Sequence, residues 1–388
     1  MNRNLWLLAL CQGLFLTNNV AFIAINGLVG LNLAPYGWMA TLPVMGYVVG
    51  GALSTGLVAR SQTRWGRQVS FQIGLLVAVL SCAVAAWAIV SKDFWLLVGA
   101  TVVAGYYSAN GQLYRFAAAE LALPAVREKA VSLVLAGGLI GAIAGPNLAA
   151  RSRGLFEVPF AGAYIVLAGV AVVAMGLMAL VRFPAHQPPA NTGSGSGGRP
   201  MGVIMRQPEF LVATAGAALG YGVMNLLMAA TPLAMQQCGL GFDDAALVLQ
   251  WHVIGMFAPG FFTGNLIKRF GVLSVMGVGV LLNLACIAIA LTGVELHQFA
   301  VALFLLGVGW NFLFTGSTTL SLGAYRPEEK DRAQAAINFW VFVVMALTSF
   351  ASGALVTTHG WFWLNVGSLP PVLLAGAALL WLAARRRR

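Results

Sequence analysis

The sequence predicts an all-α integral membrane protein with twelve transmembrane helices. Of its 388 residues, 60% are hydrophobic and only 9% are charged, whereas soluble domains carry about 25% charged residues. Apolar runs of roughly 20 residues recur along the chain, and that length crosses about 30 Å of hydrocarbon. The short alternating segments typical of a membrane β-barrel are lacking. A bundle of membrane-spanning helices is therefore the expected fold class.

The apolar segments fall into two groups of six. The expected spans are 5–30, 38–59, 69–90, 94–118, 129–150 and 160–182, then 209–236, 243–266, 272–293, 297–322, 333–356 and 361–383. Between the groups lies FPAHQPPANTGSGSGGRP, whose Gly, Ser and Pro content is typical of a flexible linker. We therefore predict an N-terminal six-helix bundle at 1–182, a cytoplasmic linker at 183–208 and a C-terminal six-helix bundle at 209–388.

The positive charges predict the orientation of these spans. With the N-terminus in the cytoplasm, eighteen of the 22 Lys and Arg residues fall in cytoplasmic segments and three in outer loops. Cytoplasmic loops of membrane proteins carry such an excess, so both termini are expected in the cytoplasm. The net charge of +11 is then explained by orientation and not by nucleic-acid binding. The tail Arg385–Arg388 is expected to contact anionic membrane lipid.

Several kinds of chemistry are excluded by what the sequence lacks. The 11 acidic residues lie at span ends or in loops, so a mid-membrane carboxylate relay is not expected. No phosphate-binding loop, catalytic triad or metal-hydrolase motif is present, which argues against an ATP-driven pump and against an enzyme. The four cysteines lack CxxC spacing, so neither a disulfide framework nor a zinc site is expected. No cofactor is predicted.

The two halves repeat one another. TGLVARSQTRWGR (Thr55–Arg67) follows the second span, and TGNLIKRFG (Thr263–Gly271) follows the eighth, about 205 residues later. Two six-span repeats with such loops resemble the major facilitator superfamily, although Ala59 and Arg60 stand where that family usually has an Asp. The resemblance implies a monomeric secondary transporter of the bacterial inner membrane. Its substrate would bind near the midplane, and the halves would rock around it.

A histidine and three methionines form a candidate site within the spans. His252 lies roughly 13 Å deep in the eighth span, and Met256 shares its helix face at i+4. Met224 and Met228 have the same spacing in the seventh span. An antiparallel hairpin centred near residue 240 would put Met228 level with His252, and Met224 level with Met256. The alternative is helix packing, because buried histidines and methionines often only fill or join helices.

These side chains have the chemistry of a soft-metal site. Thioether sulfur and imidazole without carboxylate favour copper, and Cu(I) best. Two or three neutral ligands would also release the ion, as transport requires. Cys238, in the outer turn, is a candidate entry ligand for the metal or else an ordinary loop cysteine. Copper would be the transported substrate and not a cofactor.

The pattern Met-x-x-x-Met in the seventh span and His-x-x-x-Met in the eighth resembles the CcoA-like copper importers, a bacterial branch of the major facilitator superfamily. The resemblance implies that the copper ligands are Met224, Met228, His252 and Met256. It also implies copper import into the cytoplasm for cytochrome oxidase assembly. Copper chaperones are candidate partners on the cytoplasmic side.

A small aromatic solute such as riboflavin is the alternative substrate, because the same branch contains or borders transporters of organic solutes. Polar and aromatic residues expected at mid-span support it: Asn18, Asn19, Tyr106, Tyr107, Asn110, Trp310, Asn311, Asn338 and Trp340. Such residues also join helices to one another. A third class, a membrane scaffold or copper sensor without transport, is disfavoured by the repeat.

Overall fold

In a computed structural model, every regular element of the described chain is helical. The described residues are all except 1–2, 124–126, 184–197, 327–328 and 388. Among them, nine helices are long and apolar enough to cross a membrane, or up to ten if one bent pair counts as a single span. The all-helical membrane class is therefore confirmed. The count of twelve spans and the cytoplasmic termini stay predictions.

The chain divides into two compact units. The first comprises Met1–Ala190 with Gly241–Gln250, and the second comprises Asn191–Leu240 with Trp251–Arg388. The division between Ala190 and Asn191 falls within the predicted linker at 183–208. The chain also passes between the units before Gly241 and after Gln250, so helix α10 (Phe242–Phe257) begins in one unit and ends in the other.

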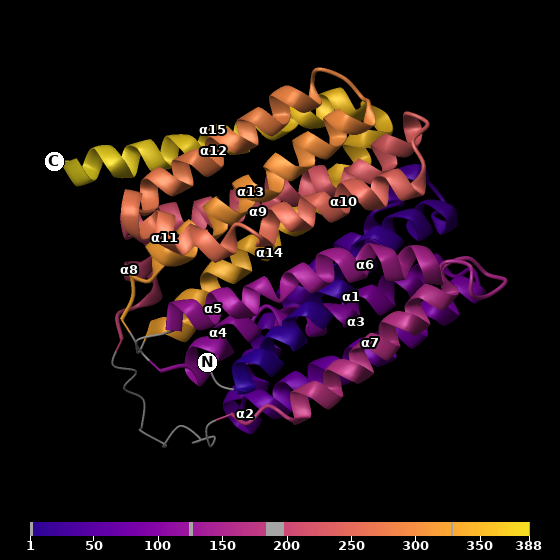
Figure 1. The fold of residues 1–388 in the computed structure, drawn as a ribbon, viewed down its shortest axis with the longest axis horizontal. Helices are drawn as coiled ribbons and strands as arrows, with labels where there is room; N and C mark the ends of the chain where they lie inside the picture. The colour runs from indigo at the N-terminus through magenta and orange to yellow at the C-terminus, as the bar shows by residue number, and fades with distance from the viewer. Residues whose placement is uncertain (1–2, 124–126, 184–197, 327–328, 388) are drawn as a thin grey trace. The chain divides into compact units, whose positions relative to one another are not determined.

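The helices of the two units follow each other in chain order (Figure 1). Those of the first part are α1 (Arg3–Leu33), η1 (Gly37–Met39), α2 (Leu42–Val90), α3 (Phe94–Gly111), α4 (Tyr114–Leu121), α5 (Arg127–Ala136), α6 (Gly138–Ser152) and α7 (Ala161–Ala179). They are followed by α8 (Met201–Met205), α9 (Pro208–Gln237), α10, α11 (Gly260–Phe270), α12 (Val272–Ala290), α13 (Leu296–Ser321), α14 (Lys330–Thr358) and α15 (Gly360–Arg387). In the first unit, α1 packs against α6 and α7; in the second, α9 packs against α13, α14 and α15.

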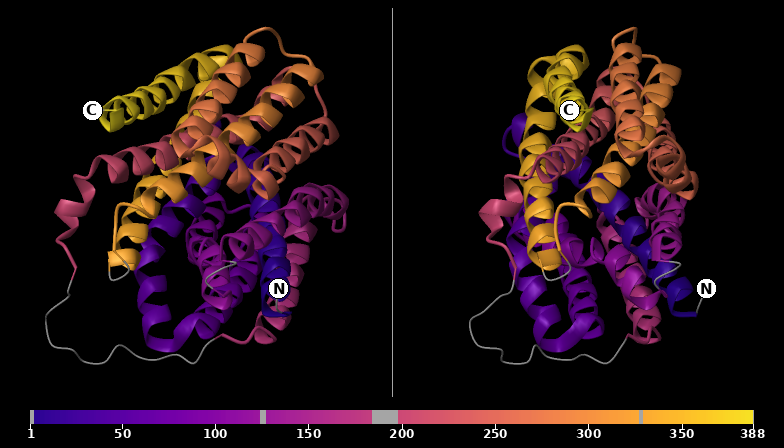
Figure 2. Two further views of the ribbon diagram at one scale, coloured as in Figure 1. Left: turned by 60° about the vertical axis from the view of Figure 1, so that its left-hand side comes forward. Right: turned by 90° about the vertical axis from the view of Figure 1, so that its left-hand side faces the viewer.

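Helix α2 covers most of the predicted span 38–59 and all of the predicted span 69–90. At 1.5 Å per residue its 49 residues would extend roughly 74 Å as one straight rod, more than twice the thickness of the hydrocarbon. The helix is broken at Gly66, whose φ of 78° and ψ of 173° are not helical. Only glycine adopts this conformation without strain. Figure 2 shows α2 turning back on itself.

Gly271, the glycine of the second half that corresponds to Gly66, has a similar non-helical conformation. Gly271 separates α11 from α12 with φ 85° and ψ 151°, and it follows Gly66 by 205 residues. Corresponding pairs of helices also approach closely, α2 with α3 in the first unit and α10 with α13 in the second. A Cβ on Gly50 would overlap the carbonyl oxygen of Val102, and one on Gly255 would lie 2.7 Å from the carbonyl oxygen of Phe304. The predicted internal repeat is therefore present in the backbone geometry.

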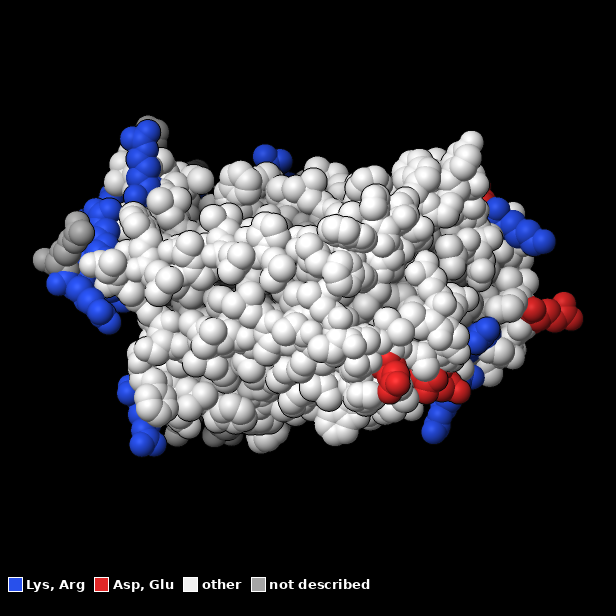
Figure 3. Space-filling view, turned by 90° about the horizontal axis from the view of Figure 1, so that it is seen from above, with Lys and Arg blue, Asp and Glu red and all other residues white. Residues whose placement is uncertain are grey.

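Large apolar side chains cover the outside of the helices. Leu53, Trp87, Leu281 and Leu380 are all more than half exposed, which in water would be costly but in lipid is not. On the face shown in Figure 3, charged side chains gather mainly toward the left and right sides of the view, and most of the surface between them is uncharged. This distribution fits a protein whose helices cross a bilayer.

The end of the predicted linker is a folded part of the second unit. Helix α8 lies within the range 183–208, and its residue Ile204 is fully buried. Ile204 packs in an apolar cluster with Phe210, Ala324 and Ala333. The prediction of a flexible linker is therefore wrong for the described residues at its end, because apolar side chains there pack against α9 and the start of α14.

An ion pair holds the same segment. Arg199 donates from its backbone nitrogen and Nε to Glu329 Oε1 at 2.7 and 2.9 Å, and from Nη2 to Oε2 at 2.7 Å. The backbone nitrogen of Arg326 donates to Oε2 at 2.9 Å. The Glu329 side chain is 0% exposed, while that of Arg199 is 30% exposed. Four donors therefore satisfy a carboxylate that has lost its water, as a buried charge requires.

This ion pair predicts a definite pH dependence. The hydrogen-bonded guanidinium of Arg199 holds the pKa of Glu329 well below its usual value of 4.5. The pKa of Glu329 is lower in the folded state than in the unfolded state. The ion pair therefore stabilises the fold fully when the pH is above the unfolded-state pKa, and this stabilisation is lost as the pH falls through the folded-state pKa. We expect Glu329→Gln to lower the melting temperature equally at pH 8 and pH 5. The difference from the parent protein should shrink only below about pH 4.

A thermal melt of each protein over this pH range measures the effect. Glu157→Gln is the matched control, because Glu157 is exposed and should leave the melting temperature unchanged. A difference that disappears between pH 8 and pH 5 would contradict the assignment of the buried carboxylate as permanently charged.

Candidate functional site

Three of the four predicted metal ligands are buried thioethers. Met224 and Met228 lie on α9, and Met256 lies on α10 with His252, which is fully buried. Cys238, the predicted entry ligand, is exposed at the C-cap of α9. Among the described residues, no cluster of three or more His, Cys, Asp or Glu side chains is placed to hold a metal. A metal site would therefore depend on the methionines.

His252 contacts α13. Its Nδ1 lies 2.7 Å from the backbone carbonyl oxygen of Leu303. A carbonyl only accepts hydrogen bonds, so Nδ1 carries the proton and donates. The other ring nitrogen, Nε2, is buried and has no hydrogen-bond partner in the described part of the chain. The lone pair of Nε2 is thus available to a ligand, which is how metal-binding histidines are commonly held.

Helix α13 gives a common scale of depth for the four residues. A Cβ on Gly216 of α9 would contact Ser317, and one on Gly220 would contact Leu313, so α9 and α13 run antiparallel. Continuing this register places Met224 near the level of Gly309 and Met228 near that of Leu305.

On α10, the hydrogen bond of His252 places this residue at the level of Leu303 of α13. A Cβ on Gly307 would lie 2.9 Å from the backbone nitrogen of Met256, which places Met256 at the level of Gly307. The four side chains therefore lie within roughly 9 Å of depth along α13. The register places Met228 between His252 and Met256. The pairing of Met228 with His252 across the hairpin stays a prediction.

The repeat adds an independent comparison. Asn19 and Tyr47 precede Met224 and His252 by 205 residues each, and in the first unit Asn19 Nδ2 donates to the Tyr47 hydroxyl at 3.1 Å. Ile23 precedes Met228 by the same interval. By analogy with the Asn19–Tyr47 pair, the repeat predicts that His252 faces Met224. The hairpin count instead predicts Met228, which lies one helical turn away from Met224. At these matched positions the second unit has soft donors, and the first unit has a polar pair.

An aromatic cluster lies beside these residues in the second unit. Trp310 of α13 contacts Tyr221 of α9 at a ring-centroid distance of 5.3 Å and Phe257 of α10 at 5.9 Å. It stacks on Phe314 at 5.0 Å with an interplanar angle of 13°. Trp310 is buried, yet its indole N–H has no hydrogen-bond partner among the described residues. The cluster can thus offer both aromatic surface and a hydrogen-bond donor.

Sequence reasoning had singled out Trp310 but missed the rings around it. Tyr221 lies three residues before Met224 and seven before Met228, so all three share a face of α9. That spacing could have marked the tyrosine. Phe257 and Phe314 carried no such signal, because aromatic residues are frequent along the spans.

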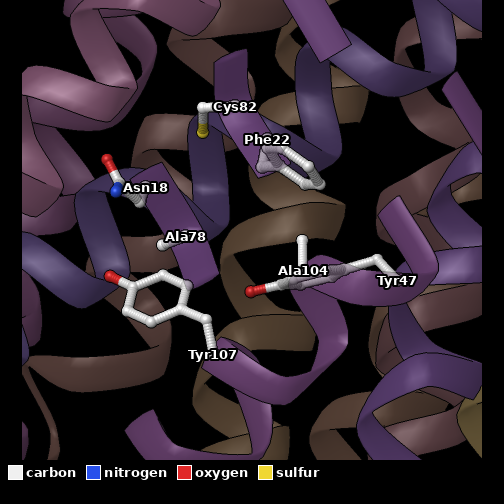
Figure 4. A pocket seen from close by; sticks show the side chains of 7 residues that line it. All are labelled: Asn18, Phe22, Tyr47, Ala78, Cys82, Ala104 and Tyr107. Carbon is white, nitrogen blue, oxygen red and sulfur yellow. The ribbon is translucent and has the colours of Figure 1, made fainter. Parts of the chain in front are cut away.

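The first unit contains a small cavity between α1, α2 and α3. It is lined by Asn18, Phe22, Tyr47, Ala78, Cys82, Ala104 and Tyr107, and Figure 4 shows the Tyr107 hydroxyl directed toward the side where Asn18 lies. Its volume is about that of one water molecule. Asn18 Oδ1 and the Tyr107 hydroxyl are buried without a direct hydrogen bond to the described chain. The cavity can hold a water but not an organic ring system.

The other polar residues predicted at mid-span mostly join helices. Asn18 donates to the Leu167 carbonyl at 3.1 Å, and Asn110 accepts from Ser70 at 3.0 Å. Asn311 bonds α10 and α11. Trp340 is exposed on α14, whereas Tyr106 and Asn338 are half-buried. The packing alternative therefore accounts for these three asparagine contacts.

Comparison with known proteins agrees with this architecture. The family model of the Major Facilitator Superfamily matches residues 5–258 and 213–388. A riboflavin transporter of Brucella anthropi, RfnT, is 36% identical over 97% of this chain and 95% of its own length. An uncharacterised transporter of Bacillus subtilis, YddS, is 27% identical over 82% of this chain and 75% of its own.

A solved structure shares the fold at much lower identity. The human organic anion transporter MFSD10 superposes with a TM-score of 0.71 and 14% sequence identity, covering 98% of this chain and all of that one. At this identity the likeness concerns the fold alone.

Proposed function

Because the chain belongs to the major facilitator superfamily and is a transporter rather than an enzyme, we propose that it carries riboflavin or a closely related flavin across the membrane. The observation that carries the proposal is 36% identity to a riboflavin transporter over nearly the full length of both chains. This relative favours the organic solute over copper, the substrate first expected from the sequence. The proposed location is the bacterial inner membrane, with both termini in the cytoplasm and the protein a monomer.

The aromatic cluster around Trp310 fits such a solute. The isoalloxazine system of a flavin is flat, aromatic and rimmed by carbonyl and imide groups. Aromatic side chains pack on flat rings in stacked or edge-to-face arrangements, and binding pockets combine such surfaces with a few placed polar groups. Trp310 provides a ring and an unpartnered donor, and Tyr221 and Phe257 provide rings from two further helices.

In the first unit, the one-water cavity is too small for a flavin. We infer that the solute reaches the Trp310 cluster when the helices separate during alternating access, the motion typical of this fold.

Uptake of labelled riboflavin tests the proposal. A bacterial host that lacks both riboflavin synthesis and riboflavin uptake is supplied with the chain, and accumulation is followed over minutes. We expect accumulation that unlabelled riboflavin competes away and that equal copper does not. Accumulation no greater than with the empty vector, with the protein verified in the membrane, would overturn the flavin proposal.

Copper import is the second candidate. It is supported by the unpartnered Nε2 of His252 and by three buried methionines at similar depth. Neutral imidazole and thioether donors suit Cu(I). On this candidate, the ligands are Met224, Met228, His252 and Met256, and the imported copper supplies cytochrome oxidase assembly through cytoplasmic chaperones.

His252→Ala separates the two candidates. If copper is carried, the variant should lower cellular copper accumulation at least about fivefold, because changing even an outer-shell partner of a metal ligand typically costs about 10–100-fold in affinity. His297→Ala is the control, since His297 is exposed and 70% accessible. Equal copper accumulation in the parent protein and both variants would eliminate copper.

A further inference from the structure

A break divides the helix that carries His252 and Met256. Helix α10 ends at Phe257 and α11 begins at Gly260, and the two are bent by 41°. Pro259 lies in the break and has no backbone N–H, so it cannot continue the helical hydrogen bonds. The last of them joins the Ala258 nitrogen to the Ile254 oxygen at 2.8 Å. Broken spans in transporters mark places where backbone groups need other partners.

One side chain of α13 bonds both sides of this break. Asn311 donates from Nδ2 to the Met256 carbonyl oxygen at 2.7 Å, on the α10 side. Its Oδ1 lies 2.7 Å from the Thr263 hydroxyl, on the α11 side. That hydroxyl is also 2.7 Å from the carbonyl oxygen of Pro259. Asn311 and Thr263 are both buried, so these bonds do not compete with bulk water.

The bonded segment carries the candidate site. Met256 is itself one of the buried thioethers, and Phe257 contacts Trp310, the residue before Asn311. His252 lies one turn earlier on the same half-helix. The hydrogen bond from Asn311 to the Met256 carbonyl therefore holds this end of α10 against α13, beside these three side chains.

The first unit lacks an equivalent break. Leu53 and Ser54, which precede Ala258 and Pro259 by 205 residues, remain helical within α2, and the non-helical residue of α2 is Gly66. The bend is thus a property of one repeat and not a requirement of the fold.

We propose that Asn311 is a positioning residue that fixes the bend between α10 and α11, and that transport depends on this bend. By holding the Met256 carbonyl and the Thr263 hydroxyl together, it sets the face that His252, Met256 and Phe257 present to the substrate. The link to transport rests on the proposed function, whereas the bend itself can be measured without any substrate.

Spin labels on both sides of the break measure the bend. Trp251 and Phe270 are exposed and lie roughly 28 Å apart by helical rise, so each is replaced by a labelled cysteine. Exposed Cys238 is changed to serine, while the other three cysteines are buried. We expect a narrow distance distribution in the parent protein. Asn311→Leu, which removes both bonds, should broaden it and shift its mean.

Four further variants isolate the cause. Asn311→Asp retains the acceptor for Thr263 but loses the donor to Met256, so it should also broaden the distribution. Thr263→Val should also broaden the distance distribution, whereas Thr263→Ser should not, because serine keeps the hydroxyl. Asn225→Leu is the matched control. Asn225 joins α9 to α14 through Met345 and Ser349, away from the break. It should reduce stability without altering the distances.

Riboflavin uptake by the same variants supplies the second readout. Uptake should fall at least tenfold in Asn311→Leu and recover in Thr263→Ser relative to Thr263→Val. The proposal is overturned if Asn311→Leu changes the distances no more than Asn225→Leu, or if it broadens them while uptake is unaffected. A parent protein that takes up no riboflavin would refute the flavin proposal, and the distances would still decide the role of Asn311 in the bend.

Discussion

Trp310→Phe is expected to weaken riboflavin uptake about tenfold at low substrate concentration while changing the stability of the substrate-free protein little. The indole N–H is buried without a partner in the described chain, and an unsatisfied buried donor costs about 1–3 kcal/mol. Removing it relieves that cost, but the smaller ring loses packing contacts, which offsets the gain. If the same N–H donates to the bound flavin, its loss removes a hydrogen bond of about 1.4 kcal/mol, which is tenfold in affinity.

Concentration-dependent uptake and a thermal melt of the substrate-free protein measure the two effects. Phenylalanine retains a ring for contacts with Tyr221 and Phe257, so the fold should persist. Trp310→Ala should abolish uptake, but it would also leave a large cavity and cost roughly 3–5 kcal/mol. Trp381→Phe is the control, because Trp381 is exposed on α15. A Trp310→Phe protein with unchanged half-saturation would exclude the indole N–H as a substrate donor.

Gly105→Ala is expected to prevent normal folding of the first unit. A Cβ at this position would overlap the backbone of Gly50 and Gly51 on α2. Backbone atoms cannot rotate away as a side chain does, so the two helices would have to separate. Alanine improves helix propensity by about 1 kcal/mol, but overpacking costs typically about 1–3 kcal/mol and more where backbones collide. The clash therefore dominates, and membrane yield and melting temperature should both fall.

Gly99→Ala, on the same helix, is the matched control. No atom lies within 4 Å of a Cβ at Gly99, so only the propensity gain remains and stability should be equal or higher. If the two variants melt alike in detergent, the close approach of α2 and α3 does not set the stability of this unit.

The helices and the repeat were predictable because they depend on short-range patterns. Apolar runs of membrane length and the repeated loop motifs that contain Gly66 and Gly271 are visible in the sequence, and in the structure both glycines have a positive φ. Pro259 was visible as well, yet the segment 243–266 was predicted as one continuous span. A proline in a span can be tolerated or can end the helix, and the Asn311 that bonds both sides of the break lies 55 residues after Met256.

The candidate site was only partly predictable for the same reason. The spacing of His252 and Met256 gives a shared face, but not the direction in which that face points. The partner of His252 is the Leu303 carbonyl on α13, and a backbone oxygen leaves no mark in a sequence. Helix depth was estimated by counting from the hairpin. That count cannot include the tilt of α9 and α10 against α13, which decides whether Met224 or Met228 is nearest to the imidazole.

The folded end of the linker also bears on how this protein can be cut and tagged. Arg199, Ile204 and Glu329 belong to one packed region, so a reporter inserted between Gly198 and Gln207 would separate the ion pair from the apolar cluster. A cut placed before Gly198 would leave both within the C-terminal fragment. Two separately expressed halves should therefore be divided ahead of this residue, which keeps the ion pair and the apolar cluster within one fragment.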